Sequence, residues 1–100
     1  MKIPKSINIL GVKYKIKLQE MIESYGEIVS GTCDTSRKII LICNTGQTED
    51  DVFETFLHEL NHAIYYETGL SFTSINADVE EIIVNQFAAV YMKLFKLSLK

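Results

Sequence analysis

The chain has 100 residues, 47% of them hydrophobic, and a net charge of −3 at pH 7, which allows one domain with a modest core over residues 1–100. The acidic balance and the lack of a basic run argue against a nucleic-acid partner. Charged residues interrupt every apolar stretch and the N-terminus lacks the apolar segment of a signal peptide, so we expect no membrane partner and a cytoplasmic location.

The first strand is expected over residues 7–18, where apolar and polar residues alternate around Gly11. The pattern predicts a half-buried antiparallel strand that is bent or bulged at the glycine. Residues 19–26 fit either a loop or a helical turn. Residues 27–33 and 38–43 predict a hairpin with its turn at residues 34–37. Its second arm is nearly all apolar, which indicates a strand covered on both faces.

Cys33 and Cys43 are the only cysteines, and they fall on opposite arms of this hairpin. If Cys33 lies opposite about Lys38, Cys43 pairs near Ile28, and the two sulfurs are too far apart for a disulfide. We therefore expect two reduced thiols.

Two helices follow the strands. Thr48 is the expected N-cap of the first, with Asp51 at the third helical position, and the helix should run to about Glu67 with Gly69 closing it. After a loop at residues 70–75, the second helix should start near residue 76 or 78 and continue to about Lys96. The order predicts an α+β fold: a small three-stranded antiparallel or mixed sheet followed by two packed helices.

The first helix carries the motif HExxH, formed by His58, Glu59 and His62, which include both histidines of the chain. Residues four apart share one helix face, so the two imidazoles can bind a single Zn²⁺ while Glu59 accepts a proton from water. Such a motif also arises by chance on a solvated face. Here the histidines lie opposite the apolar arc of the helix, flanked by Tyr65 and Tyr66, which indicates a cleft. An HExxH motif in such a place predicts a zinc peptidase.

A zinc site with two histidines needs a third protein ligand, and the second helix offers Glu80 and Glu81. Helical phase puts Glu80 in the middle of an apolar arc with Ile83, Phe87 and Tyr91, where a buried charge would need a partner such as a metal. Glu81 lies at the edge of that arc, with Asn85 one turn on and able to hydrogen-bond a ligand. The residues alone leave both glutamates open.

The two motifs together resemble short HExxH metallopeptidase domains common in phages and mobile elements, and are similar to the ImmA/IrrE-like group. The resemblance rests on HELNHA at residues 58–63 and on EIIVNQFAA at residues 81–89, which matches E-x-x-A-N-x-F-A-A except at Val84. It covers most of the chain, although only the helical motifs are specific. It implies a minimal zincin-like core of the gluzincin type with Glu81 as the third zinc ligand and Glu80 in reserve.

The two histidines, a glutamate ligand and Glu59 together predict hydrolysis of peptide bonds in a peptide or protein substrate, which the resemblance does not identify. The sheet edge beside the motif helix is the expected groove. A 100-residue chain has little room for substrate subsites, so a partner protein could supply specificity. The alternative is a non-catalytic zinc-binding or protein-interaction module, although a structural zinc site gains nothing from Glu59. A metal-dependent nuclease is disfavoured by the acidic charge.

Overall fold

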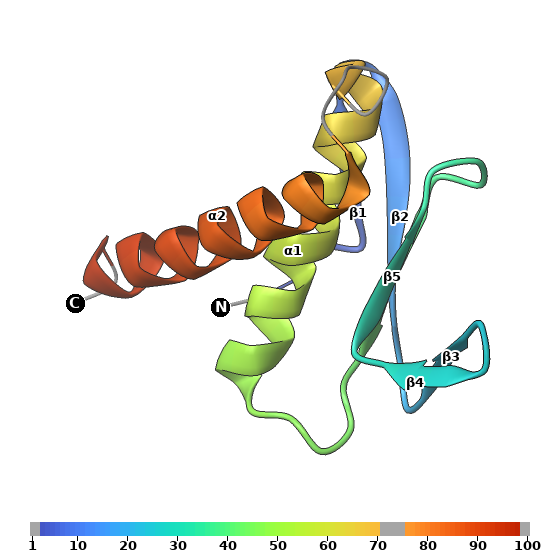
Figure 1. The fold of residues 1–100 in the computed structure, drawn as a ribbon. Coiled ribbons are helices and arrows are strands. Elements are labelled where there is room, and N and C mark those ends of the chain that lie inside the picture. The colour runs from blue at the N-terminus through green and yellow to red at the C-terminus, as the bar shows by residue number, and fades with distance from the viewer. Residues whose placement is uncertain (1–2, 71–75, 99–100) are drawn as a thin grey trace.

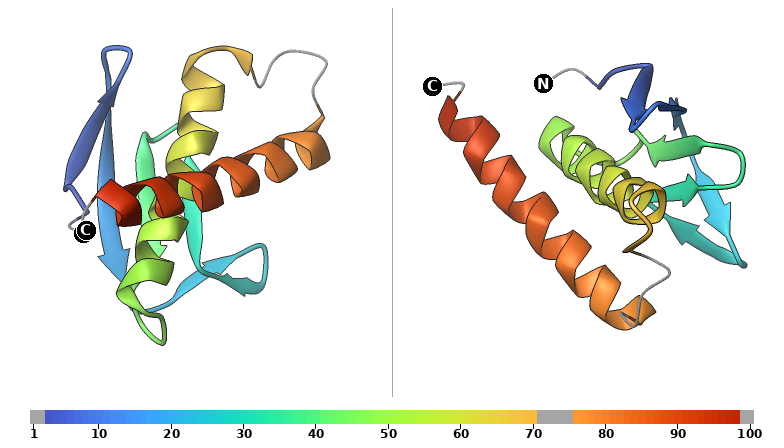
Figure 2. Two further views of the ribbon diagram at one scale, coloured as in Figure 1. Left: turned by 90° about the vertical axis from the view of Figure 1, so that its left-hand side faces the viewer. Right: turned by 90° about the horizontal axis from the view of Figure 1, so that it is seen from above.

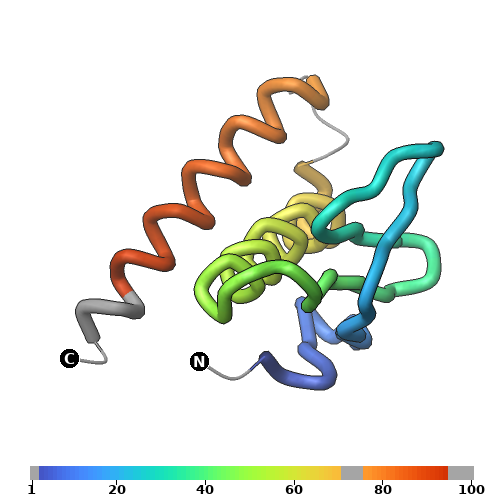
Figure 3. The backbone as a smooth tube through the Cα atoms, turned by 90° about the horizontal axis from the view of Figure 1, so that it is seen from below, coloured from blue at the N-terminus to red at the C-terminus, as the bar shows by residue number. Residues whose placement is uncertain are grey.

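The computed structural model describes residues 3–70 and 76–98, and these form three layers (Figures 1 and 2). A sheet lies on one side, helix α1 in the middle and helix α2 on the far side, as the view from below also shows (Figure 3). The elements in chain order are β1 (Ser6–Ile9), β2 (Val12–Gln19), β3 (Ile22–Ser24), β4 (Glu27–Val29), β5 (Gly31–Asp34), β6 (Ile39–Cys43), α1 (Glu49–Glu67) and α2 (Ala77–Ser98).

The main sheet is mixed and has four strands in the order β1-β2-β6-β5. Its two outer pairs are antiparallel, whereas the central pair, β2 with β6, is parallel, with Ile16 opposite Ile40. Strands β3 and β4 form a separate two-stranded hairpin. The predicted α+β class is therefore confirmed, but the predicted number of three strands is wrong, because two of the expected strands are each divided and residues 22–24 form a further strand.

The first division falls at Gly11, where we expected a bend and the chain instead makes a hairpin. Leu10 and Gly11 have φ values of 50° and 87°, and positive φ at both central residues suits a two-residue hairpin turn. The side-chain oxygen of Asn8 accepts a hydrogen bond of 2.7 Å from the backbone N–H of Gly11. The alternating residues thus form β1 and β2, and Tyr14 and Ile16 point from β2 into the core.

The second division falls at Ser30, within the segment that we expected to be one arm of a hairpin. Strand β4 turns back on β3, so residues 19–26 contribute a strand rather than a loop or a helical turn. Strand β5 continues to the predicted turn, where a side-chain oxygen of Asp34 accepts hydrogen bonds of 3.0 Å from the backbone N–H groups of Ser36 and Arg37.

Strand β6 is covered fully on one face only, which corrects the expectation of cover on both. Ile40 and Ile42 are completely buried, whereas Ile39 and Leu41 are half-buried, because α1 and α2 lie on the same side of the sheet. The register also differs from the predicted one, since Cys33 lies opposite Ile40 rather than Lys38. Cys33 and Cys43 are both free thiols, the first half-buried and the second buried.

Helix α1 begins and ends where the sequence predicts. Thr48 is the N-cap and forms a capping box with Asp51, and Gly69 follows the helix with a φ of 81°. At the C-terminal end, one carboxylate oxygen of Glu67 accepts hydrogen bonds of 2.6 Å from the Tyr14 hydroxyl and 2.7 Å from the Lys38 ammonium group. These contacts fix the end of α1 against the sheet.

Helix α2 crosses α1 on the side away from the sheet (Figure 2). It packs through Val84, Ala88 and Met92, which are buried. The arc that we expected around Glu80 is not the packed face, because Phe87 and Tyr91 are exposed. Residues 71–75 of the predicted loop lie outside the described residues. Among the described residues, no helix has the length and apolar content needed to cross a membrane.

Candidate metal centre

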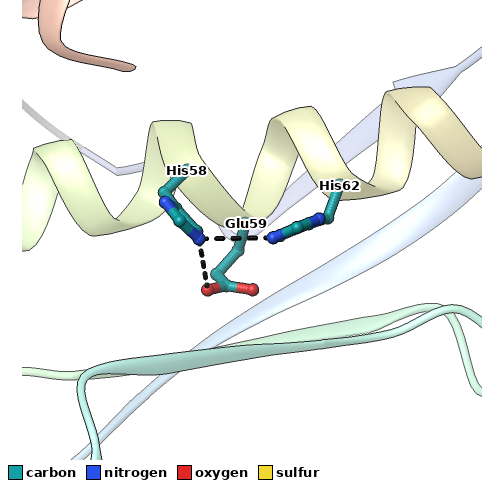
Figure 4. Close-up of side chains that lie close together, drawn as sticks. All are labelled: His58, Glu59 and His62. Carbon is teal, nitrogen blue, oxygen red and sulfur yellow. Dashed lines mark hydrogen bonds and ion pairs between the residues drawn. The ribbon is translucent and has the colours of Figure 1, made fainter. Parts of the chain in front are cut away.

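The HExxH residues lie in the middle of α1 and point toward the strands (Figure 4). Each of His58, Glu59 and His62 offers one possible ligand atom, and these atoms lie within 4.8 Å of one another. The histidines are half-buried, and Glu59 is only 8% exposed. The predicted cluster is therefore assembled, and its residues could hold a metal ion.

The spacing of the two imidazoles suits a shared ion. Their Nε2 atoms are 3.2 Å apart, and two ligands at the roughly 2.0–2.1 Å of a Zn–N bond in a tetrahedral site are separated by about 3.3 Å. The separation of the two nitrogens is therefore the one that a shared tetrahedral ion would require.

Glu81 faces the same point from α2. Its two carboxylate oxygens lie 2.9 Å from Nε2 of His58 and 3.0 Å from Nε2 of His62. Two imidazole nitrogens and one carboxylate thus converge from two helices, although Glu81 itself is half-exposed.

Glu80 contacts the opposite nitrogen of one histidine. Its carboxylate lies 2.8 Å from Nδ1 of His62, and because a carboxylate only accepts, Nδ1 must carry the hydrogen. Nε2 of a neutral His62 then presents a lone pair to the Glu81 carboxylate, and Asn85 hydrogen-bonds the His58 ring. A cation between these groups would satisfy the facing lone pairs, as in a metal site whose ligands are oriented by outer partners.

Burial sets the charge balance of the site. It raises the pKa of Glu59 to about 7, with His62 opposing the shift and the Glu81 carboxylate adding to it. Burial also lowers the pKa of His58, and Glu81 acts in the opposite direction. Neutral imidazole is the form that binds a metal ion, so the surroundings of His58 favour the state that a ligand requires.

A cleft of about 1020 Å³ opens beside these residues. Its walls come from α1, α2, β5 and the β3–β4 hairpin, and they include Gly31, Cys33 and Tyr25. Strand β5 is at the edge of the main sheet, because among the described strands it pairs only with β6. The cleft therefore has a backbone edge on one side and the histidines on the other.

The structure also separates the two tyrosines that flank the motif. Tyr65 is buried and packs in the interior, whereas Tyr66 lines the cleft. The sequence reasoning missed Gly31, where a Cβ atom would lie 3.1 Å from Cγ of Glu59. A glycine inside a strand pattern signals close backbone approach and could have pointed to this position.

No protein-family model, curated protein or solved structure matches the chain in the comparisons with known proteins. The resemblance drawn from the helical motifs therefore remains a prediction, and the geometry of the site is the basis for any function proposed for the chain.

Proposed function

We propose that this protein is a zinc-dependent peptidase in which His58, His62 and Glu81 hold the ion and Glu59 is the general base. One observation carries the proposal. The Glu81 carboxylate faces both Nε2 atoms, at 2.9 and 3.0 Å, and the buried Glu59 lies beside these three groups without being one of them. This arrangement separates three ligands from one proton acceptor, as hydrolysis requires.

Zinc is the metal that this set of donors favours. Two imidazoles from an HExxH helix together with one carboxylate are typical of catalytic zinc, and three protein ligands leave one position for water or substrate. Zn²⁺ bound there would supply a Lewis acid that makes water nucleophilic near neutral pH and polarises a carbonyl.

Glu59 performs the proton transfers. Its carboxylate lies 3.9 Å from Nε2 of His58, beside the converging groups. It accepts a proton from water as the water oxygen bonds to the carbonyl carbon of the peptide. It then gives that proton to the amide nitrogen as the C–N bond breaks, which releases an amine and a carboxylic acid that loses its remaining proton to solvent.

The cleft supports an extended peptide as the substrate. The free edge of β5 offers backbone N–H and C=O groups to an added strand, and such pairing gives affinity without a deep side-chain pocket. Because β5 begins at Gly31, which packs against Glu59, a peptide on this edge passes beside the general base.

Zinc titration combined with a hydrolysis assay tests the proposal. We expect wild-type protein to bind one Zn²⁺ per chain and to cleave an unstructured peptide mixture followed by mass spectrometry, with cleavage lost in a strong chelator. Glu59→Gln should keep the zinc and abolish cleavage, whereas Glu81→Gln should lower zinc affinity by at least about tenfold.

Glu54→Gln is the matched control, because Glu54 lines the same cleft from α1 and has no role in the proposal. Failure to bind zinc would overturn the whole proposal. Stoichiometric zinc without cleavage of any peptide would leave a non-catalytic zinc-binding module. Loss of zinc in Glu59→Gln would make Glu59 a ligand instead of the base.

A further inference from the structure

Helix α2 carries an apolar stripe on the side that faces away from α1. Its members recur at spacings of four, four, three and four residues, which keeps them on one side of a helix: Val79, Ile83, Phe87, Val90 and Leu94. Four of them are widely exposed, at 42% for Val79, 45% for Phe87, 49% for Val90 and 56% for Leu94. The ring of Tyr91 stacks on Phe87 at its edge, with centroids 6.1 Å apart.

Helix α2 makes few buried contacts with the rest of the described chain. It crosses α1 instead of running along it (Figure 2), so both of its ends extend past the crossing. The buried contacts are made by Val84, Ala88 and Met92 on the opposite side. A continuous apolar stripe on a soluble surface marks an interaction site when it reaches several hundred Å².

We propose that this stripe is the interface of a homodimer in which two α2 helices pack antiparallel across a two-fold axis near Phe87. The stripe is complementary to itself in this arrangement. Val79 of one chain meets Leu94 of the second copy, Ile83 meets Val90, and the two Phe87 rings meet at the centre. A two-fold interface requires such reciprocal pairing.

Charge favours the antiparallel orientation. The N-terminal part of α2 is acidic, with Asp78 exposed, and Lys93 is exposed near the other end of the stripe. Antiparallel pairing places the acidic first turn of one α2 at the level of Lys93 in the second copy and sets the two helix dipoles antiparallel, which is favourable. Parallel pairing would place like charges together at both ends.

The size of the stripe suits a small dimer interface. With Tyr91 at its edge, the stripe exposes roughly 500 Å² of side-chain surface per chain, or about 1,000 Å² for the pair, near the lower limit of specific interfaces. We therefore expect a dimer that dissociates on dilution, instead of an obligate one.

Dimer formation would also affect the metal centre, because Glu80, Glu81 and Asn85 of that centre lie on α2. A second copy that holds α2 in place would hold these side chains against the histidines. Metal binding and dimerisation would then strengthen each other by the same factor. This coupling depends on the proposed metal site, whereas the dimer itself does not.

Sedimentation velocity of the whole chain from about 1 to about 200 µM tests the dimer, first without metal and then with Zn²⁺. We expect a monomer–dimer equilibrium whose midpoint moves up at least tenfold in Val90→Glu. Glutamate suits an exposed helix position, and circular dichroism checks the fold. Ile28→Glu is the control, because Ile28 is more exposed but lies on β4, and it should leave the midpoint unchanged.

Cysteine cross-linking tests the orientation. Phe87→Cys should form an intermolecular disulfide on oxidation, whereas Leu94→Cys should not, because antiparallel pairing separates its two copies. Wild-type protein controls for the two natural thiols. A monomer at every concentration, a dimer indifferent to Val90→Glu, or cross-linking through Leu94→Cys would each overturn the proposal. If zinc leaves a confirmed dimer unchanged, only the coupling fails.

Discussion

Gly31 on β5 and Thr55 on α1 lie so close together that a Cβ atom on the glycine would be 2.7 Å from Cγ2 of the threonine. The same Cβ atom would lie 3.1 Å from Cγ of Glu59. The absence of a side chain at residue 31 therefore lets the edge strand approach the helix beside Glu59.

Gly31→Ala should push β5 and α1 apart. We expect a loss of about 1–3 kcal/mol in the free energy of unfolding, as for other overpacked sites, and a larger fall in hydrolysis than in zinc affinity. Adding Thr55→Ser removes the clashing methyl group and should recover part of the stability. Chemical denaturation of the two variants measures this, and an unchanged stability in Gly31→Ala would contradict the close packing.

Glu80 is expected to orient a histidine instead of binding the metal, because its contact is with Nδ1 of His62. Removing such an outer partner typically lowers metal affinity by about 10–100-fold, so Glu80→Ala should do so in a competition titration with Zn²⁺. Glu27→Ala, at an exposed glutamate on β4 outside the cleft, should have little effect. If Glu80→Ala binds zinc as weakly as Glu81→Ala, Glu80 is itself a ligand.

Ala88 sets the distance between the two helices at the cleft, where it is only 1% exposed and lines the cavity. Ala88→Leu should separate α2 from α1, cost about 1–3 kcal/mol of stability and weaken zinc binding by displacing Glu81. Ala89→Leu adds the same atoms at the neighbouring, less buried position and should cost less. Thermal melts with and without Zn²⁺ distinguish the two variants, and equal losses would argue against a tight crossing.

Glu67 should make stability depend on pH. Hydrogen bonds from Lys38 and Tyr14 lower the pKa of Glu67 below its ordinary value of 4.5. Because the folded-state pKa is the lower one, this group stabilises the fold above pH 4.5 and loses that effect as pH falls through the folded-state pKa.

Urea unfolding should therefore show a difference in the free energy of unfolding between wild type and Glu67→Gln at about pH 7. This difference should shrink at about pH 3. Glu23→Gln, on an exposed position of β3, is the control and should give a small difference at both values. A difference between wild type and Glu67→Gln that grows on acidification would contradict this role for Glu67.

The sequence was sufficient for α1 and for the cluster on it, because the signals there are local. Thr48, Asp51 and Gly69 define the two ends of the helix within a few residues of each, and the spacing of His58 and His62 fixes their common face. The sheet was harder to predict. The break at Ser30 depends on which strands meet, and the parallel pairing of β2 with β6 joins residues more than 20 positions apart.

The packed face of α2 could not be chosen from the sequence, because the helix is apolar on two sides. Phase analysis favoured the side with the larger residues Phe87 and Tyr91, whereas the structure packs the side with Val84 and Ala88. Small side chains permit a close crossing, and that crossing brings Glu81 within 3.0 Å of both histidines. The face of α2 that packs on α1 is therefore the one that brings Glu81 to the histidines, although the other face carries the larger apolar residues.

The β3–β4 hairpin is a place in the fold at which the chain can be lengthened. The β2–β6 and β5–β6 ladders are formed without residues 22–29, and the hairpin turns at Tyr25 and Gly26, both exposed. Exposed turns with few structural obligations are where insertions are best tolerated. Since Tyr25 also lines the cleft, residues grafted at this turn would extend one wall of it. The hairpin is thus a position at which one wall of the cleft can be redesigned while the sheet and the histidines stay intact.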